Sequence, residues 1–137
     1  MAVTGIESVL LLVARLLFGG VIAFMGLNHF LQSAEMTGYA QYKGLPTPRL
    51  SVLASGVVLV LGGLGIVAGV FPLISAVVVA GFILVSALTM HDFWAVDDDR
   101  RQDELTHFLK NVVMAGGALA IAALGAQSWA IGLGIGL

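Results

Sequence analysis

Cysteine is absent from the 137-residue chain, and charged residues make up only 10% of it, against roughly 25% in an ordinary soluble domain. Without cysteine there can be no disulfide, no Cys-ligated zinc or iron–sulfur cluster and no thiol catalysis. With six Lys and Arg and a net charge of −2, the chain lacks the basic surface that binds nucleic acid. So few charges cannot cover a soluble globule, and the composition indicates an integral membrane protein.

The chain is rich in long uncharged segments, and 59% of its residues are hydrophobic. The run from Leu50 to Met90 is 41 residues without an ionisable side chain. As one helix it would be about 60 Å long, twice the thickness of the hydrocarbon layer. It must turn back, and Pro72 near its midpoint favours a turn because the residue before proline avoids helical angles. We therefore predict helices at about 50–70 and 72–95.

Two further membrane helices are expected on either side of this pair. The first covers about 6–30. The last covers about 100–126 and starts at the acidic segment 97–99, where Asp99 and Gln102 fit a capping box. The predicted fold is an all-α integral membrane protein, a single domain over 1–137 that forms an antiparallel bundle of four transmembrane helices.

The first connection is predicted to contain a short interfacial helix. Ser33 is a natural N-cap, the segment up to Tyr42 is amphipathic, and Gly44 and Pro46 would end the helix. Such a helix would lie in the headgroup layer and roof the polar residues below it.

Basic residues are unevenly distributed among the connections. Arg15 lies inside the first helix, and the other five lie in or near the first and third connections: Lys43, Arg49, Arg100, Arg101 and Lys110. By the positive-inside rule, we expect loops 31–49 and 96–107 in the cytoplasm and both termini outside the cell membrane.

Small residues recur at four-residue spacing, which lets helix backbones approach closely in lipid. The pairs are Gly65 with Gly69, Gly116 with Ala120, and Ala118 with Ala122. They indicate either packing inside the bundle or the face of a homo-oligomer.

Polar side chains gather at the depth of the charged connections. The candidate ligand-binding residues are Asn28, His29, His91, Asp92, Trp94, His107, Lys110 and Asn111. These residues could simply cap helix ends and anchor the bundle at the headgroups. They could instead form a quinone site, with a histidine bonding a ring carbonyl and Trp94 stacking on the ring. A metal site of the three histidines with Asp92 is a third alternative, but no two histidines have i, i+4 spacing and no metal ligand is assigned.

Arg15 is the most costly residue in the chain, because a charge deep in the membrane is unfavourable. Its side chain should lean toward the N-terminal surface. We predict a structural role in which it binds Gln127 or Ser128 after the last helix, with Glu7 as a counter-charge. The rival hypothesis is a functional arginine that grips an anionic ligand.

Several motifs resemble the DoxX family of small four-helix membrane proteins, and the resemblance covers nearly the whole chain. They are GLNHF at 26–30, MTGYA at 36–40 with KGLP at 43–46, HDFW at 91–94 and HFLKN at 107–111. The family is related to DoxD, a membrane subunit of a thiosulfate:quinone oxidoreductase, so the resemblance implies membrane redox by association. Many members carry a Glu early in the second helix, where this chain has Leu53 to Gly56 without a carboxylate.

Two function classes follow. The chain is either a quinone-linked subunit of a membrane oxidoreductase assembly, or a non-catalytic structural or assembly partner of another membrane complex. It has no CxxCH haem motif and no phosphate-binding loop. We expect no covalently bound cofactor, so a redox role would need a quinone and a partner protein that carries the cofactor, besides the lipid bilayer itself.

Overall fold

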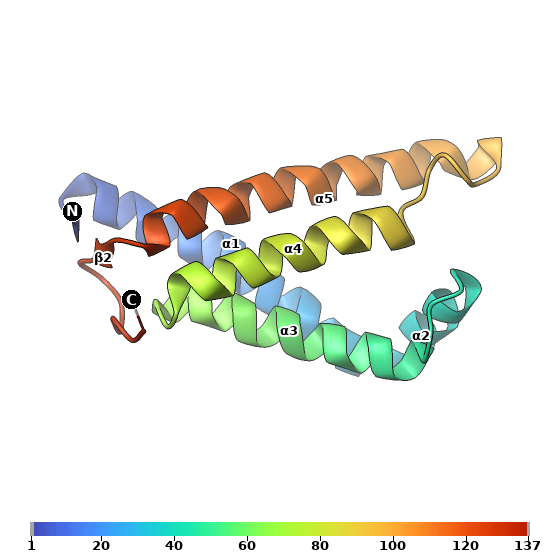
Figure 1. Cartoon of the computed structure of the whole chain (residues 1–137), viewed down its shortest axis with the longest axis horizontal. Coiled ribbons are helices and arrows are strands. Elements are labelled where there is room, and N and C mark those ends of the chain that lie inside the picture. Colours follow the sequence, from blue (N-terminus) through green and yellow to red (C-terminus); the bar gives the residue numbers. More distant parts are fainter. Residues whose placement is uncertain (1, 137) are drawn as a thin grey trace.

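Four long helices form the bundle in the computed structural model, which describes residues 2–136 (Figure 1). They are α1 (Ile6–Leu31), α3 (Pro48–Ala68), α4 (Pro72–Met90) and α5 (Asp98–Gly125). Each is long and apolar enough to cross a membrane. The short helix α2 (Ser33–Tyr42) occupies the first connection. The predicted all-α fold, including the short helix, is confirmed.

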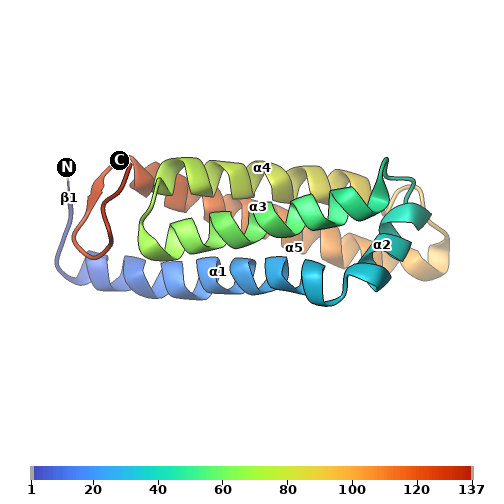
Figure 2. The ribbon, with the colours of Figure 1, turned by 90° about the horizontal axis from the view of Figure 1, so that it is seen from below.

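The long helices pack as two pairs. α1 lies along α3 and α4 lies along α5, and α3 packs against α4 to join the pairs (Figure 2). Close approach of α1 and α3 depends on glycine, since a Cβ at Gly63 would lie 2.5 Å from the Gly19 carbonyl oxygen. The buried core lies where the pairs meet and includes Ile22, Leu59, Ile66, Val79, Ile83 and Ala118.

The outer surface of the bundle is apolar. Large side chains such as Leu10, Phe24 and Val113 are more than half exposed, as expected for groups that face lipid. Of the small-residue pairs, Gly65 with Gly69 and Ala118 with Ala122 are buried inside the bundle, whereas Gly116 and Ala120 are exposed on α5.

Both ends of the described chain lie at the end of the bundle opposite α2 (Figure 1). β1 (Ala2–Val3) pairs in parallel with β2 (Ser128–Trp129), with Val3 opposite Trp129. The tail then returns to α3 and α4, where the Leu133 amide donates to the Ala68 carbonyl and the Phe71 amide to the Ile135 carbonyl. The glycine-rich tail therefore covers this end of the bundle, an arrangement that the sequence analysis did not predict.

Helix boundaries differ from the prediction in three places. α4 ends at Met90 rather than 95, because the next residues form turns in which the Phe93 and Ala95 amides donate to the His91 and Asp92 carbonyls. The capping box at Asp99 was wrong: Asp97 is the N-cap of α5 and makes no side-chain cap hydrogen bond. Ser33 is the first helical residue of α2 rather than its N-cap.

Candidate functional site

A buried carboxylate organises the α2 end of the bundle. Glu104 on α5 is only 4% exposed. It accepts hydrogen bonds from Tyr39 Oη at 2.9 Å, His91 Nδ1 at 3.0 Å and Arg100 Nη2 at 3.3 Å. The donors come from α2, from the α4–α5 connection and from the preceding turn of α5. Glu104 therefore ties the short helix and the connection to α5.

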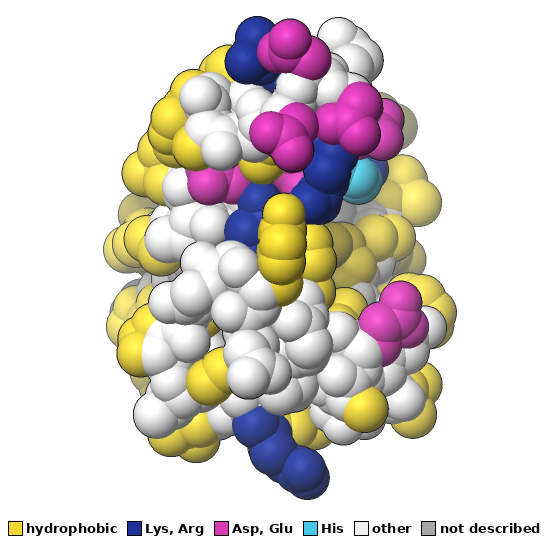
Figure 3. All heavy atoms as spheres, turned by 90° about the vertical axis from the view of Figure 1, so that its right-hand side faces the viewer, with side chains coloured by type: hydrophobic (Ala, Val, Ile, Leu, Met, Phe, Trp, Pro, Cys, Tyr) yellow, Lys and Arg dark blue, Asp and Glu magenta, His cyan; other side chains and the backbone are white. Residues whose placement is uncertain are grey.

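Lys43 and Asp92 form the second part of this cluster. Lys43 Nζ lies 2.5 Å from Asp92 Oδ1 and 3.7 Å from Glu104 Oε1, and its side chain is only 5% exposed. We call Tyr39, Lys43, His91, Asp92, Arg100 and Glu104 the Glu104 network. Figure 3 shows the basic and acidic side chains gathered on this end of the molecule.

The ionisable groups of the network shift one another's pKa values. The hydrogen bond from Lys43 holds the pKa of Asp92 below its ordinary value. Burial alone would lower the pKa of Lys43, but its bond to Asp92 and the nearby Glu104 raise it above the ordinary value. Burial, reinforced by the hydrogen bond to Glu104, raises the pKa of Tyr39. Lys43 and Asp92 are thus held in their charged forms, and Tyr39 is held neutral.

A partly open cavity of about 710 Å³ lies directly beside the network, and all five helices contribute to its wall. Most of the wall is apolar, with Ile22, Leu59, Phe82 and Met114 among its residues. Its polar side chains include His29, Tyr39, His91 and Asn111, together with Gln32, Glu35 and four Ser and Thr residues of α3 and α4. The cavity therefore combines an apolar space with polar groups that can anchor a ligand, the usual character of a small-molecule site.

His29 has a defined tautomer in this wall. Its Nδ1 lies 2.8 Å from the Met25 carbonyl oxygen, and because a carbonyl only accepts, Nδ1 carries the proton. In the neutral ring Nε2 is then a hydrogen-bond acceptor. On α5, Asn111 Nδ2 makes a long 3.4 Å bond to the Ile83 carbonyl. The wall thus offers both an acceptor and an amide.

The candidate residues from the sequence separate into two groups. Only His29, His91 and Asn111 line the cavity. Asp92 pairs with Lys43. His107 stacks on His91 with ring centroids 5.1 Å apart, and Trp94 packs edge-to-face against Phe93 and Phe108. Asn28 and Lys110 lie outside the cavity wall.

The alternative of a metal site gains no support. Within residues 2–136, no group of three or more His, Cys, Asp or Glu side chains is placed to hold a metal ion.

Four members of the network were not among the predicted site residues: Tyr39, Lys43, Arg100 and Glu104. Glu104 lies three residues before His107 and seven before Asn111, so helical spacing puts it on the face that was already singled out. That spacing could have identified it within the acidic segment. The sequence analysis placed the short helix over the polar residues, but no spacing indicated that Tyr39 and Lys43 are the side chains that reach Glu104.

Arg15 lies at the other end of the bundle and is almost fully buried, at 1% exposure. Its guanidinium donates to the carbonyls of Ile66, Val67 and Ile131, and it lies 4.5 Å from the centre of the Trp129 ring. The last carbonyls of a helix lack intrahelical donors and carry partial negative charge, which makes the end of α3 a good partner for a cation.

The predicted partners of Arg15 are therefore corrected. Neither Gln127 nor Ser128 accepts one of the guanidinium hydrogen bonds described above. Glu7 is exposed and forms no ion pair within the described part of the chain. The prediction compared depths on α1 and α5 alone and did not consider the carbonyls at the end of α3.

Comparison with known proteins agrees with the fold and the motifs. The sequence profile of the DoxX family matches residues 10–92, which covers α1 to α4 and the first residues of the α4–α5 connection. Inner membrane protein YphA of Escherichia coli (strain K12) is 29% identical over 119 residues, 87% of this chain and 85% of that protein. No solved structure has a significant match. The chain therefore belongs to the DoxX family and is a multi-pass membrane protein.

Proposed function

We propose that the cavity beside the Glu104 network binds a quinone-type ring, and that the chain is a quinone-linked subunit of a membrane oxidoreductase assembly. The observation that carries this proposal is the apolar cavity of about 710 Å³ with His29, His91 and Asn111 in its wall. An aromatic ring with two oxygens needs an apolar space and a few polar groups at one edge.

The polar groups suit both redox forms of such a ring. His29 Nε2 accepts a hydrogen bond, as the hydroxyl of the reduced ring requires. The Asn111 amide has a second N–H beyond the one directed at Ile83, and it can donate to the carbonyl of the oxidised ring. The chain has no cysteine and no CxxCH motif, so a partner protein would supply the electron-carrying cofactor.

Replacement of His29 tests the ring site. His29→Leu removes the acceptor, and Asn28→Leu, one residue away and outside the cavity wall, is its matched control. We expect His29→Leu to weaken binding of a short-tail quinone to protein in lipid nanodiscs by about tenfold, the worth of one hydrogen bond. Asn28→Leu should leave binding unchanged.

Organic extraction of the purified protein with mass spectrometry is the complementary measurement. Co-purifying quinone in the wild type, depleted in His29→Leu, would support the proposal. Absence of quinone from the extract, together with no binding of added quinone, would overturn it.

A non-catalytic structural or assembly role is the second candidate, because most of the polar residues already have protein partners. Asp92 is paired with Lys43, His91 with Glu104, and Trp94 with two phenylalanines. If binding of quinone fails, these residues would be anchors at the headgroup layer, and the oligomer or partner complex extracted from membranes would be the functional unit.

The orientation in the membrane is a further part of the proposal. Four of the six basic residues lie in the connections or in the first turns of helices that adjoin them, and Lys110 lies on the same half of α5, which favours cytoplasmic connections and external termini. Because the chain has no cysteine, single cysteines are clean reporters. Gln41→Cys should react with an impermeant thiol reagent only after the cells are opened, and Ala130→Cys should react in intact cells. The reverse pattern would invert the topology.

A further inference from the structure

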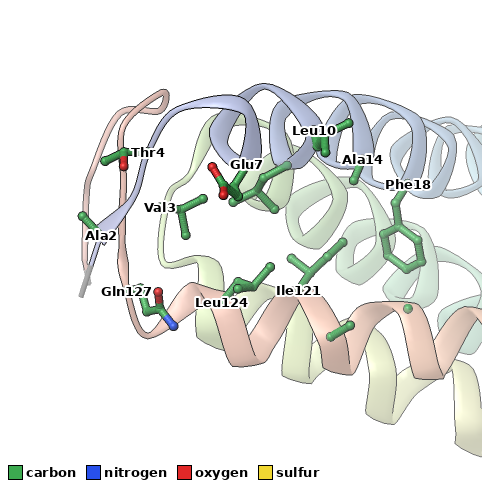
Figure 4. A pocket seen from close by; sticks show the side chains of 13 residues that line it. Ala2, Val3, Thr4, Glu7, Leu10, Ala14, Phe18, Ile121, Leu124 and Gln127 are labelled. Atoms are coloured by element: carbon green, nitrogen blue, oxygen red, sulfur yellow. The ribbon is translucent and has the colours of Figure 1, made fainter.

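A second cavity, of about 790 Å³, lies between α1 and α5 at the end of the bundle that holds the termini. Its side walls are apolar, formed by residues such as Leu10, Ala14 and Phe18 of α1 and Ile121 and Leu124 of α5, which face one another across the gap (Figure 4). Polar side chains occur only toward the chain ends, at Thr4, Glu7 and Gln127. We call this gap the α1–α5 crevice.

The crevice and the cavity beside the Glu104 network follow one another along the same two helix faces. On α1, positions 7, 11, 14 and 18 line the crevice and positions 22, 25 and 29 line the other cavity. On α5, positions 124, 121 and 117 line the crevice, and positions 114 and 111 line the other cavity. These steps of three and four residues define one stripe on each helix. The stripe from Glu7 to His29 is about 33 Å long, close to the thickness of the hydrocarbon layer.

Phe18 lies where the two spaces meet, opposite Gly117. A Cβ on Gly117 would lie 3.4 Å from Phe18 Cε2, which is van der Waals contact, so the ring closes the space beside Gly117 and a chain can pass only if the Phe18 side chain turns aside. A Cβ on the neighbouring Gly116 would have no atom within 4 Å, and Gly116 is exposed. Of these two adjacent glycines, only Gly117 borders the passage.

We infer that the α1–α5 crevice holds the long polyisoprenoid tail of the quinone whose ring lies beside the Glu104 network, and that the tail passes Gly117 with the Phe18 side chain turned aside. This inference rests on the proposed function. The ring anchors lie at one end of the stripe, and beyond them the wall is apolar down to Glu7. α1 and α5 make no extensive contact along it within residues 2–136, so a chain can enter sideways from the lipid.

The test compares two adjacent glycines and two quinones. Gly117→Leu fills the passage, whereas Gly116→Leu adds the same side chain at the same helix depth but toward lipid. Affinities for a short-tail quinone and for a long polyprenyl quinone are measured in nanodiscs. We expect Gly117→Leu to weaken binding of the long-tail quinone by about tenfold, because close packing contributes most of the affinity between apolar groups in lipid. Binding of the short-tail quinone should be unchanged. Gly116→Leu should alter neither.

Ala14→Phe is a second block one turn along the crevice, at an exposed position that tolerates a larger side chain. It should reproduce the selective loss even if Gly117→Leu does not fold. If every folded variant bound the long-tail and the short-tail quinone with equal affinity, the tail site would be wrong. The ring site would still be supported. Failure of the wild type to bind either quinone would overturn both. A phospholipid that co-purifies with the wild type and Gly116→Leu but not with Gly117→Leu would assign the crevice to an acyl chain and overturn the quinone tail.

Discussion

Each end of the bundle is organised around a buried ionised side chain, Glu104 at one end and Arg15 at the other, and the two are satisfied in different ways. Glu104, at the α2 end, is bonded by side chains from α2, from the α4–α5 connection and from its own helix. Arg15, at the termini end, is bonded by three backbone carbonyls. Buried charges are costly unless they are fully paired, and both solutions meet that requirement.

The two ends differ in whether the partners of the buried charge can be mutated or titrated. Side-chain partners can be mutated or titrated, and those of Glu104 include a histidine and a tyrosine that line the 710 Å³ cavity. Backbone carbonyls have no charge to lose, and Arg15 holds the end of α3 to the tail without a titrating partner. We therefore regard the α2 end as the adjustable end and the termini end as a fixed anchor.

The largest effect is expected at the anchor. Arg15→Leu leaves the carbonyls of Ile66, Val67 and Ile131 without their donor in a region of low polarity, which should lower the free energy of unfolding by about 3 kcal/mol or more. Arg15→Lys should be intermediate, because an ammonium cannot reproduce the planar fork. Thermal unfolding in detergent measures both.

Arg49→Leu is the matched control for Arg15, since Arg49 is exposed at the start of α3. It should change stability by less than about 0.5 kcal/mol. If Arg15→Leu were as stable as the wild type, the anchor role would be wrong, and a role for Arg15 in binding an anionic ligand would take its place.

Glu104→Gln should have the next largest effect. The variant keeps the shape of the side chain but removes the charge shared by His91, Arg100 and Lys43. We expect a loss of about 2–3 kcal/mol in the free energy of unfolding, measured by thermal unfolding. Asp103→Asn, on the exposed neighbouring position, should be neutral; equal effects of the two variants would contradict the central position of Glu104.

A change of pH should separate the two ends. The lowered pKa of Asp92 means that its bond to Lys43 stabilises the fold above the unfolded-state pKa of about 3.9 and is lost as pH falls through the lower folded value. The raised pKa of Lys43 means that its contribution is complete below about 10.4 and is lost as pH rises through the higher folded value. Arg15 stays charged throughout this range.

The chain's two tryptophans report this separation, because Trp94 lies at the α2 end and Trp129 contacts Arg15. In Trp129→Phe, the fluorescence of Trp94 should change below about pH 4. In Trp94→Phe, the fluorescence of Trp129 should be constant over the same range. A simultaneous change of both would mean that the ends do not respond independently.

The smallest effect is expected for Tyr39→Phe. It removes the hydroxyl that donates to Glu104 at 2.9 Å and also lies 3.2 Å from the Met90 carbonyl. The free energy of unfolding should fall by about 1 kcal/mol. Hydrogen exchange of α2 amides should accelerate accordingly. Tyr42→Phe keeps the ring and removes an exposed hydroxyl that accepts a hydrogen bond from Arg100; it should have little effect, so equal exchange in both variants would argue against Tyr39 as the attachment of α2.

Much of the architecture follows from linear features. The 41-residue uncharged run and Pro72 place the α3–α4 turn correctly, and Gly44 with Pro46 places the end of α2. The end of α4 was predicted five residues late, since the segment from His91 to Ala95 has no helix-breaking residue. Its departure from the helix accompanies the pairing of Asp92 with Lys43, which is 49 residues away in the chain.

The candidate site was predictable to a smaller extent. His29, His91 and Asn111 were placed at one depth by helical rise, and they do line one cavity. Depth alone did not separate Glu104 from the other acidic residues of 97–104; only its spacing of three and seven residues from His107 and Asn111 marks it.

The sequence by itself determined the membrane class, the number of spans and the gathering of charge at one end, because these depend on hydropathy and length along one chain. Only the tertiary structure decided the partners of Glu104 and Arg15, the cover formed by the tail and the crevice between α1 and α5. Each of these depends on which helices pack together and on which backbone groups are left without donors where the helices end, and neither is recorded in the order of residues along a single helix.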